Sequence, residues 1–284
     1  MSAFHNIAAQ HEYEVTAGRR FRFGRNWASF LKRLNQARIA EAEKNLIEFL
    51  GEEALTGKVF LDVGSGSGLF SLAARRLGAT VTSFDYDGQS VACTKELRRR
   101  YLPDDPLWTI EQGSVLDTRY LAGLGQFDIV YSWGVLHHTG AMWKAMGNVK
   151  SLVKTGGLLF IAIYNDCGEV SRWWLERKRR YNALPRAFRP LYATCVWIPQ
   201  ELRSLIRSIR SGELRSYVRE LTSATSGRGM SWINDVVDWV GGYPYEYASV
   251  EDITEFYRRD GFEPLKIREN RSYGCHQLVF RRVR

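Results

Sequence analysis

The sequence lacks the marks of a disulfide-stabilised, metal-binding or membrane-spanning protein. Its four cysteines (positions 93, 167, 195 and 275) are scattered and form no CxxC pair, so we expect reduced thiols in a cytoplasmic protein. No apolar run approaches the roughly 18 to 20 residues of a membrane span. The first residues show no basic segment followed by an apolar stretch, so we expect no secretory signal. With 45% hydrophobic and 25% charged residues, the composition is that of a globular chain.

Acidic residues are scarce in one segment. Between Ser171 and Met230 there are 13 Arg and Lys, four Glu and no Asp, so this segment carries the whole net charge of +9. Within it, "ELRSLIRSIR" (201–210) predicts an amphipathic basic helix. Its apolar face would hold Leu202, Leu205, Ile206 and Ile209, and its basic face Arg203, Arg207 and Arg210. Three interpretations stay open: a helical lid, docking at an anionic membrane surface or substrate, and, less favoured, nucleic-acid binding.

Strand and helix patterns alternate through most of the chain. Strands are predicted at Val59–Val63, Thr80–Asp85, Trp108–Gln112, Phe127–Ser132, Leu158–Tyr164, Pro264–Arg268 and His276–Arg281. Helix-length connections separate most of them, which favours an α/β, Rossmann-like, doubly wound and mostly parallel seven-stranded sheet with helices on both faces.

Three regions are predicted around this pattern. Residues 1–50 form an N-terminal helical cover that includes one amphipathic helix over Leu31–Leu50. Residues 51–165 and 246–284 form the core, in which a helix at 249–262 with a Ser cap precedes the last two strands. Residues 166–245 form a basic, aromatic, helical insertion between the fifth and sixth strands. An insertion at the ligand-binding end of such a sheet is expected on the acceptor side, as a lid.

"FLDVGSGSGLF" (60–70) places a Gly-rich turn between a predicted strand and a helix that begins at Leu69. Such a turn brings backbone N–H groups close to a ligand. The dinucleotide fingerprint G-x-G-x-x-G would need its third glycine at Leu69, but that glycine comes one residue early, at Gly68. A phosphate-binding P-loop would need a Lys after the turn, and none follows. The loop therefore fits neither pyrophosphate motif.

The run Asp62-Val63-Gly64-Ser65-Gly66-Ser67-Gly68 resembles the first motif of the class I S-adenosylmethionine (SAM)-dependent methyltransferases. SAM has no phosphates, so its loop needs glycines for close backbone approach. An acid is expected at the end of the second strand for the ribose hydroxyls, and Asp85 stands there. The resemblance covers roughly residues 50–165 and 245–284. It extends to small-molecule members of the family, among them the ubiquinone-biosynthesis O-methyltransferases.

The resemblance implies a set of cofactor contacts, with S-adenosylhomocysteine (SAH) as the product. Besides Asp62, the glycines and Ser65, these are Asp85, Tyr86, Ser114, Val115, Asp117, Ser132 and Trp133.

The catalytic candidates lie where the fourth and fifth strands end. They are His138, which occupies the family's recurrent histidine position, with His137 and Tyr164. An equally weighted interpretation makes His138 structural. The acceptor is expected near Trp27, Asn165, Asp166, Trp232, Tyr243 and Tyr245. No acid follows the fourth strand, which metal-dependent catechol methylation would need, so no metal is predicted.

These patterns predict metal-independent transfer of a methyl group from SAM to a small-molecule acceptor, with oxygen preferred. Transfer to a small thiol or amine is an alternative. So are a nucleic-acid or protein methyltransferase that docks through the insertion, and a SAM-binding protein without catalysis. A cytoplasmic protein is expected, with peripheral association at the inner membrane face as a further hypothesis.

Overall fold

A computed structural model describes residues 7–51, 55–213, 215, 236, 239–272 and 274–284. Seven strands form one sheet in the order β3-β2-β1-β4-β5-β7-β6. Of these, β7 runs antiparallel to its two neighbours. The strands are β1 (Val59–Val63), β2 (Thr80–Asp85), β3 (Trp108–Gln112), β4 (Phe127–Trp133), β5 (Val153–Tyr164), β6 (Phe262–Arg268) and β7 (Cys275–Arg282). The predicted seven-stranded, mostly parallel sheet is confirmed.

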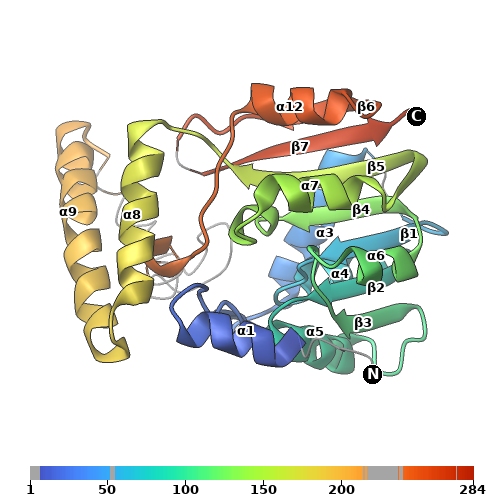
Figure 1. Cartoon of the computed structure of the whole chain (residues 1–284), viewed down its shortest axis with the longest axis horizontal. Coiled ribbons are helices and arrows are strands. Elements are labelled where there is room, and N and C mark those ends of the chain that lie inside the picture. Colours follow the sequence, from blue (N-terminus) through green and yellow to red (C-terminus); the bar gives the residue numbers. More distant parts are fainter. Residues whose placement is uncertain (1–6, 52–54, 214, 216–235, 237–238, 273) are drawn as a thin grey trace.

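Helices cover both faces of the sheet (Figure 1). On one face lie α3 (Gln36–Leu50), α4 (Leu69–Arg76) and α5 (Gly88–Tyr101), and on the other α6 (Thr118–Leu124), α7 (Met142–Lys150) and α12 (Val250–Arg258). The central strands are apolar on both faces because both are covered. Alternate residues of β1 therefore enter different clusters: Phe60 packs with α3 and α4, and Leu61 with α7.

Two elements differ most from the prediction, and the other strand boundaries agree within two residues. The single helix expected over Leu31–Leu50 is two helices, α2 (Gly24–Leu31) and α3. Asn35 separates them, because its side chain accepts a hydrogen bond from the Arg38 backbone N–H (3.1 Å) and so caps α3. Strand β5 begins at Val153, five residues before the predicted start, because Val153 pairs with Phe127 ahead of an irregularity in the ladder.

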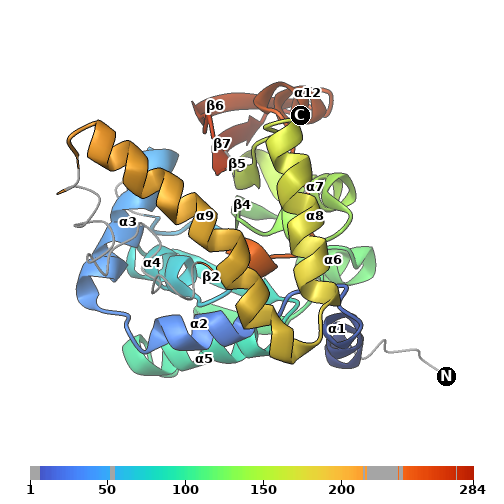
Figure 2. The ribbon, with the colours of Figure 1, turned by 90° about the vertical axis from the view of Figure 1, so that its left-hand side faces the viewer.

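The insertion forms α8 (Glu169–Ala183) and α9 (Arg189–Arg210), which lie beyond the carboxyl ends of the parallel strands (Figures 1 and 2). Pro199 lies inside α9 rather than at an end. The N-terminal α1 (Ile7–Thr16) and α2 lie at the same end of the sheet, so the segments before and after the core meet there.

Candidate cofactor and acceptor site

The Gly-rich loop is held in a conformation that only glycine adopts readily. Gly64, Gly66 and Gly68 have φ angles of +81°, +55° and +82°. Two backbone N–H groups of the loop, at Gly64 and Ser65, donate to the Phe84 carbonyl at 2.8 and 3.1 Å. The loop is thereby fixed to the end of β2, and Gly68 leads into α4.

Neighbouring side chains fill the space that these glycines leave. A Cβ atom at Gly64 would lie 2.4 Å from Cγ1 of Val135, and one at Gly66 would lie 2.9 Å from the Trp27 indole. The glycines thus serve close packing against the end of β4 and against α2. The sequence motif identified the glycines but gave no sign of these two partners.

Asp85 connects the loop to the end of β2. Its carboxylate accepts hydrogen bonds from the backbone N–H groups of Gly66 (2.9 Å) and Asp87 (2.8 Å). Burial raises the pKa of Asp85 to about 6 despite these donors. Asp62 accepts a hydrogen bond from the Ser71 hydroxyl (2.5 Å), and burial raises the pKa of its carboxyl to about 7.

The N-terminal cover takes part in the site through residues that the sequence analysis did not select. Arg20 donates to the His138 carbonyl (2.8 Å), pairs with Glu14 (2.7 Å) and lies over the Tyr86 ring at 4.9 Å. The Gly24 N–H donates to Asp87 (2.8 Å). The aromatic and basic segment at 19–30 was the available signal, but its partners lie far away in the sequence.

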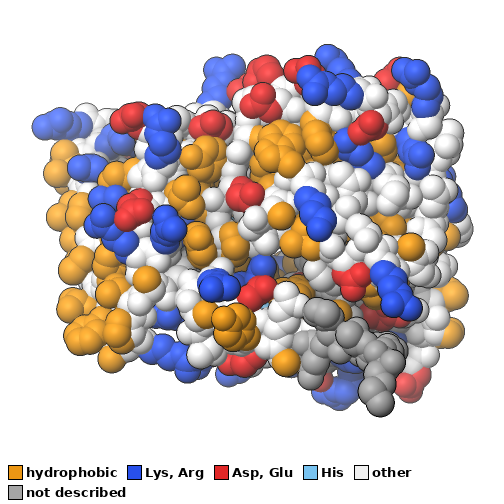
Figure 3. Space-filling model, viewed as in Figure 1, with side chains coloured by type: hydrophobic (Ala, Val, Ile, Leu, Met, Phe, Trp, Pro, Cys, Tyr) orange, Lys and Arg blue, Asp and Glu red, His pale blue; other side chains and the backbone are white. Residues whose placement is uncertain are grey.

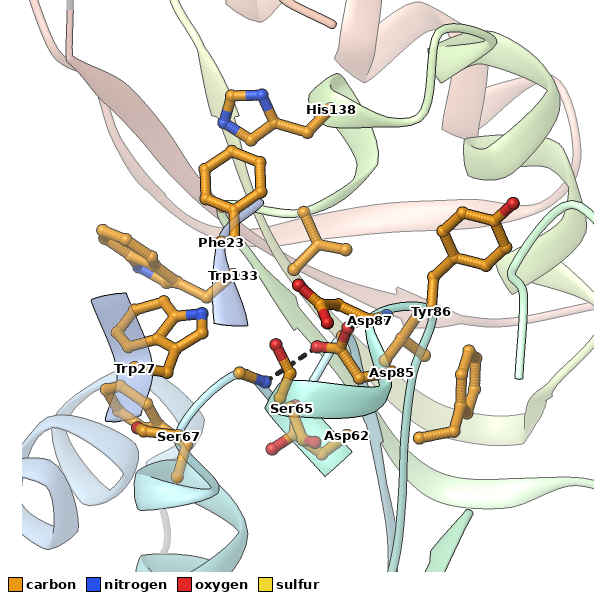
Figure 4. Close-up of a pocket in the computed structure, with 18 of the residues that line it drawn as sticks. Phe23, Trp27, Asp62, Ser65, Ser67, Asp85, Tyr86, Asp87, Trp133 and His138 are labelled. Atoms are coloured by element: carbon orange, nitrogen blue, oxygen red, sulfur yellow. Dashed lines mark hydrogen bonds between the residues drawn. The ribbon is translucent and has the colours of Figure 1, made fainter. Parts of the chain in front are cut away.

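These elements enclose a cavity of about 890 Å³ (Figure 4). In the close-up, Trp27, Phe23, Trp133 and His138 lie on one side of the Gly66–Asp85 hydrogen bond, and Tyr86 lies on the other. The predicted cofactor residues that line the cavity are Asp62, Gly64, Ser65, Gly66, Asp85, Tyr86, Ser114, Val115, Asp117 and Trp133. Gly68 and Ser132 are not among its lining residues. Ser132 instead donates to the Val63 carbonyl (3.0 Å), which ties β4 to β1.

The residues after β3 have local structural tasks as well. Asp117 caps α6 by accepting from the N–H groups of Arg119 and Tyr120, each at 3.0 Å. The Ser114 hydroxyl accepts from the Leu116 N–H (3.2 Å). The Asp117 carboxylate and the Ser114 hydroxyl can therefore bind a ligand only through the hydrogen-bonding sites that these contacts leave open.

The two adjacent histidines differ in environment. His138 lines the cavity, and its Nδ1 lies 2.5 Å from the Pro244 carbonyl oxygen. A carbonyl can only accept, so Nδ1 carries the proton, and a neutral ring has its lone pair at Nε2. His137 is fully buried, and its Nδ1 accepts from the Tyr164 N–H (3.2 Å). His137 does not line the cavity.

Of the predicted acceptor residues that the structure describes, Trp27 lines this cavity and the others do not. Tyr164 and Tyr245 belong to an aromatic cluster that joins the insertion to β5, with ring centroids 5.0 Å apart. Asn165 bonds through Oδ1 to His276 (2.8 Å), and Asp166 accepts from the Gly168 N–H (2.7 Å).

Two further predicted acceptor residues remain. Tyr243 accepts through its backbone carbonyl from the Phe21 N–H (2.8 Å) and does not line the cavity. Trp232 lies outside the described residues.

The cavity suits SAM in volume and chemistry. Its volume lies within the roughly 300–1,000 Å³ of small-molecule sites, and loop glycines and a carboxylate line it together. Among the described residues, no group of three or more His, Cys, Asp or Glu side chains is placed to hold a metal ion.

Comparison with known proteins agrees with this arrangement. The model of the methyltransferase domain family matches residues 30–208. Magnesium protoporphyrin IX methyltransferase of Synechocystis, solved with bound SAH, shares the fold, with a TM-score of 0.55 and 13% identity over 96% of this chain and 97% of that one.

Curated relatives match over shorter stretches. A ubiquinone biosynthesis O-methyltransferase of Pseudomonas paraeruginosa is 30% identical over 127 residues, which are 42% of this chain and 50% of the relative. The ribosomal protein L11 methyltransferase of Helicobacter hepaticus is 40% identical over 73 residues, 25% of this chain and 22% of the relative. The matched region thus spans half or less of each of these two relatives.

Proposed function

We propose that this chain, which belongs to the family of class I SAM-dependent methyltransferases, methylates a small-molecule acceptor on oxygen. The observation that carries this proposal is one cavity that holds both the cofactor residues and His138. The similarity to ubiquinone biosynthesis O-methyltransferases also supports a small acceptor. Transfer to sulfur or nitrogen of a small molecule is the alternative at the same site.

The residues around the loop would bind and orient SAM, whose sulfonium supplies an electrophilic methyl group. Asp85 has both oxygens engaged by backbone N–H groups, which fixes the carboxylate for the ribose hydroxyls. Val115 supplies an apolar surface, and Ser114 and Asp117 supply polar atoms for the adenine. Trp133, at the end of β4, would pack beside the reacting centre. Such positioning contributes much of the rate of an in-line displacement.

His138 would act as the general base at Nε2. Because Nδ1 donates to the Pro244 carbonyl, the ring is fixed in the tautomer that can accept a proton at Nε2. His137 and Tyr164 would support this position: the Tyr164 ring lies 4.0 Å from that of His137 and 5.5 Å from that of His138. Both become positioning residues in this proposal rather than groups that touch substrate.

The test of the reaction class uses the purified protein, methyl-labelled SAM and a cell extract. Label in an organic-soluble, aqueous small-molecule or headspace fraction supports the proposal. Label confined to acid-precipitable macromolecules contradicts it and favours a protein or nucleic-acid acceptor. SAM binding without any transfer favours a non-catalytic binding protein.

The test of the base is His138→Asn, because the amide can still donate to the Pro244 carbonyl while Nε2 is lost. We expect the rate constant of the chemical step to fall by about 10²-fold or more, with SAH affinity retained. An unchanged rate constant assigns His138 to structure alone.

We further propose that α9 places the enzyme on an anionic membrane surface. Five of its apolar side chains form a stripe, hereafter the α9 stripe: Leu191, Ile198, Leu202, Ile206 and Ile209, between 48% and 64% exposed. Figure 3 shows hydrophobic side chains gathered over α9 with basic side chains beside them. Arg203, Arg207 and Arg210 are exposed on the same helix. Surface-lying helices combine such apolar and basic faces.

Two further observations bear on the insertion. None of its described residues lines the cavity. No helix in the described part of the chain has both the length and the apolar character to cross a membrane.

Flotation with vesicles tests this surface. We expect binding to vesicles that contain phosphatidylglycerol, weaker binding to pure phosphatidylcholine, and loss of binding when Leu202, Ile206 and Ile209 are changed to Ser. Leu265→Ser, at a 50% exposed position on β6, is the matched control and should bind normally. Salt-sensitive RNA binding without vesicle binding would favour the nucleic-acid alternative instead.

A further inference from the structure

The cavity continues beyond the cofactor residues into a compartment between α3 and the sheet. Its lining residues on α3 are Ala37, Arg38, Glu41, Ala42 and Asn45, spaced to share one side of the helix. On the sheet, Tyr131 and Trp133 of β4 and Gln277 of β7 line it. None of these α3 and β7 residues belongs to the loop or to the predicted cofactor set.

Strand register explains why Trp133 and Gln277 line the same compartment. Trp133 pairs with Ala162, and Ala162 pairs with Gln277, so the three side chains form one row on the same face. Of this row, Trp133 and Gln277 line the cavity, and the short side chain of Ala162 between them does not. Ala42 lines the compartment from α3.

Three buried polar atoms in this compartment have no hydrogen-bond partner within the protein: the Tyr131 hydroxyl, Asn45 Oδ1 and Gln277 Oε1. Tyr131 is 2% exposed, and its ring is fixed by Phe60 and Phe70, with centroids at 5.8 and 5.0 Å. Buried polar groups are nearly always hydrogen-bonded, and leaving one unpaired is costly. Three such atoms around one compartment indicate a ligand that satisfies them.

We infer that this compartment is the acceptor subsite, in which Tyr131, Asn45 and Gln277 hold the polar end of the substrate. The inference rests on the proposed function, because it places the acceptor beside the SAM site. Two of the three atoms are amide oxygens, so the end group must donate hydrogen bonds. The walls include the rings of Phe30, Phe70 and Trp133. Arg38 and Glu41 also line the compartment, so charged side chains of both signs are present beside these atoms. The ligand class is a flat, largely apolar molecule with a hydroxyl or primary amide at its far end.

The experiment compares phenol with toluene, which differ by a hydroxyl in place of a methyl group. Dissociation constants are measured with SAH-saturated protein by ligand-observed NMR. Tyr131→Phe and Gln277→Met each remove one polar partner and keep the volume. We expect each to shift the phenol/toluene ratio about 3- to 10-fold toward toluene, the size of one lost hydrogen bond. The matched control is Tyr101→Phe, a partly buried tyrosine outside the cavity.

Each result has a defined meaning. A ratio that shifts in both cavity variants but not in Tyr101→Phe supports the subsite. An unchanged ratio, or no binding of either probe to the SAH-saturated protein, overturns it. SAH affinity is measured separately for every variant. If SAH itself does not bind the wild-type protein, the proposed function fails; if SAH binds and the ratio is unchanged, only the subsite fails.

Discussion

The loop offers a quantitative test at Gly64. Replacing it by Ala imposes two separate costs. A residue with a Cβ atom at a φ of +81° is disfavoured by about 1–2 kcal/mol. The new Cβ atom would also lie 2.4 Å from Cγ1 of Val135, and overpacking of this kind costs about 1–3 kcal/mol. We therefore expect Gly64→Ala to lower the free energy of unfolding by about 2–5 kcal/mol.

Gly156 provides the matched control. Its φ is +80°, and nothing lies within 4 Å of the Cβ atom that Ala would add. Gly156→Ala should therefore cost only the backbone part, about 1–2 kcal/mol. The loss of unfolded-chain freedom, which stabilises both variants by about 0.4–1 kcal/mol, cancels in the comparison.

Val135→Ala removes the two atoms that Gly64→Ala would meet most closely, Cγ1 at 2.4 Å and Cγ2 at 2.6 Å, and keeps Cβ at 3.0 Å. In a double-mutant cycle, we expect the pair to recover most of the packing part, a coupling energy of about 1–3 kcal/mol. The assay is urea unfolding, with SAH affinity by calorimetry as the functional readout. SAH binding should weaken at least 10-fold in Gly64→Ala, because the loop N–H groups must move, and should not change in Gly156→Ala. Equal costs for the two single variants, or a coupling energy near zero, would refute this account of the loop.

Three further predictions concern the residues around the loop. Burial raises the pKa of Asp62 to about 7 and that of Asp85 to about 6, whereas unfolded aspartate titrates near about 4. The folded protein therefore holds protons that the unfolded chain releases, and the free energy of unfolding should fall as the pH rises from about 4 to about 7. In urea unfolding at several pH values, Asp62→Asn should make this fall smaller. Tyr131→Phe should raise the free energy of unfolding by about 1 kcal/mol in the absence of ligand, because it deletes a buried hydroxyl without a partner; destabilisation would mean that the hydroxyl is satisfied. Arg20→Met should weaken SAH binding about 10-fold in calorimetry by releasing the N-terminal cover from the His138 carbonyl, whereas Arg22→Met, which breaks an exposed ion pair with Glu12, should have little effect.

The sequence alone determined the strand pattern and the cofactor loop. The central strands β1, β4 and β5 carry the apolar runs that a doubly covered parallel sheet requires, and the glycines at 64, 66 and 68 lie where β1 turns into α4. These features are local: they depend on residues within a few positions of one another. The split between α2 and α3 was missed because the apolar spacing continues across Asn35, whose capping role depends on backbone conformation.

The tertiary structure decided which of the chemically capable residues share a cavity. His137 and His138 are neighbours in the sequence, yet a single turn places one in the core and the other on the cavity wall. Tyr164 was a catalytic candidate and Tyr245 was expected near the acceptor, but their rings pack together in the cluster that attaches the insertion.

The compartment at α3 gives the converse case, in which the fold brings together residues that the sequence analysis did not select. Asn45, Tyr131 and Gln277 are far apart in the chain, and none belongs to a recognisable motif. They come together because β4, β5 and β7 are neighbours in the sheet and α3 lies across that face. Strand order and register depend on contacts between distant segments. One sequence shows the segments, and only the folded chain shows which of their side chains meet.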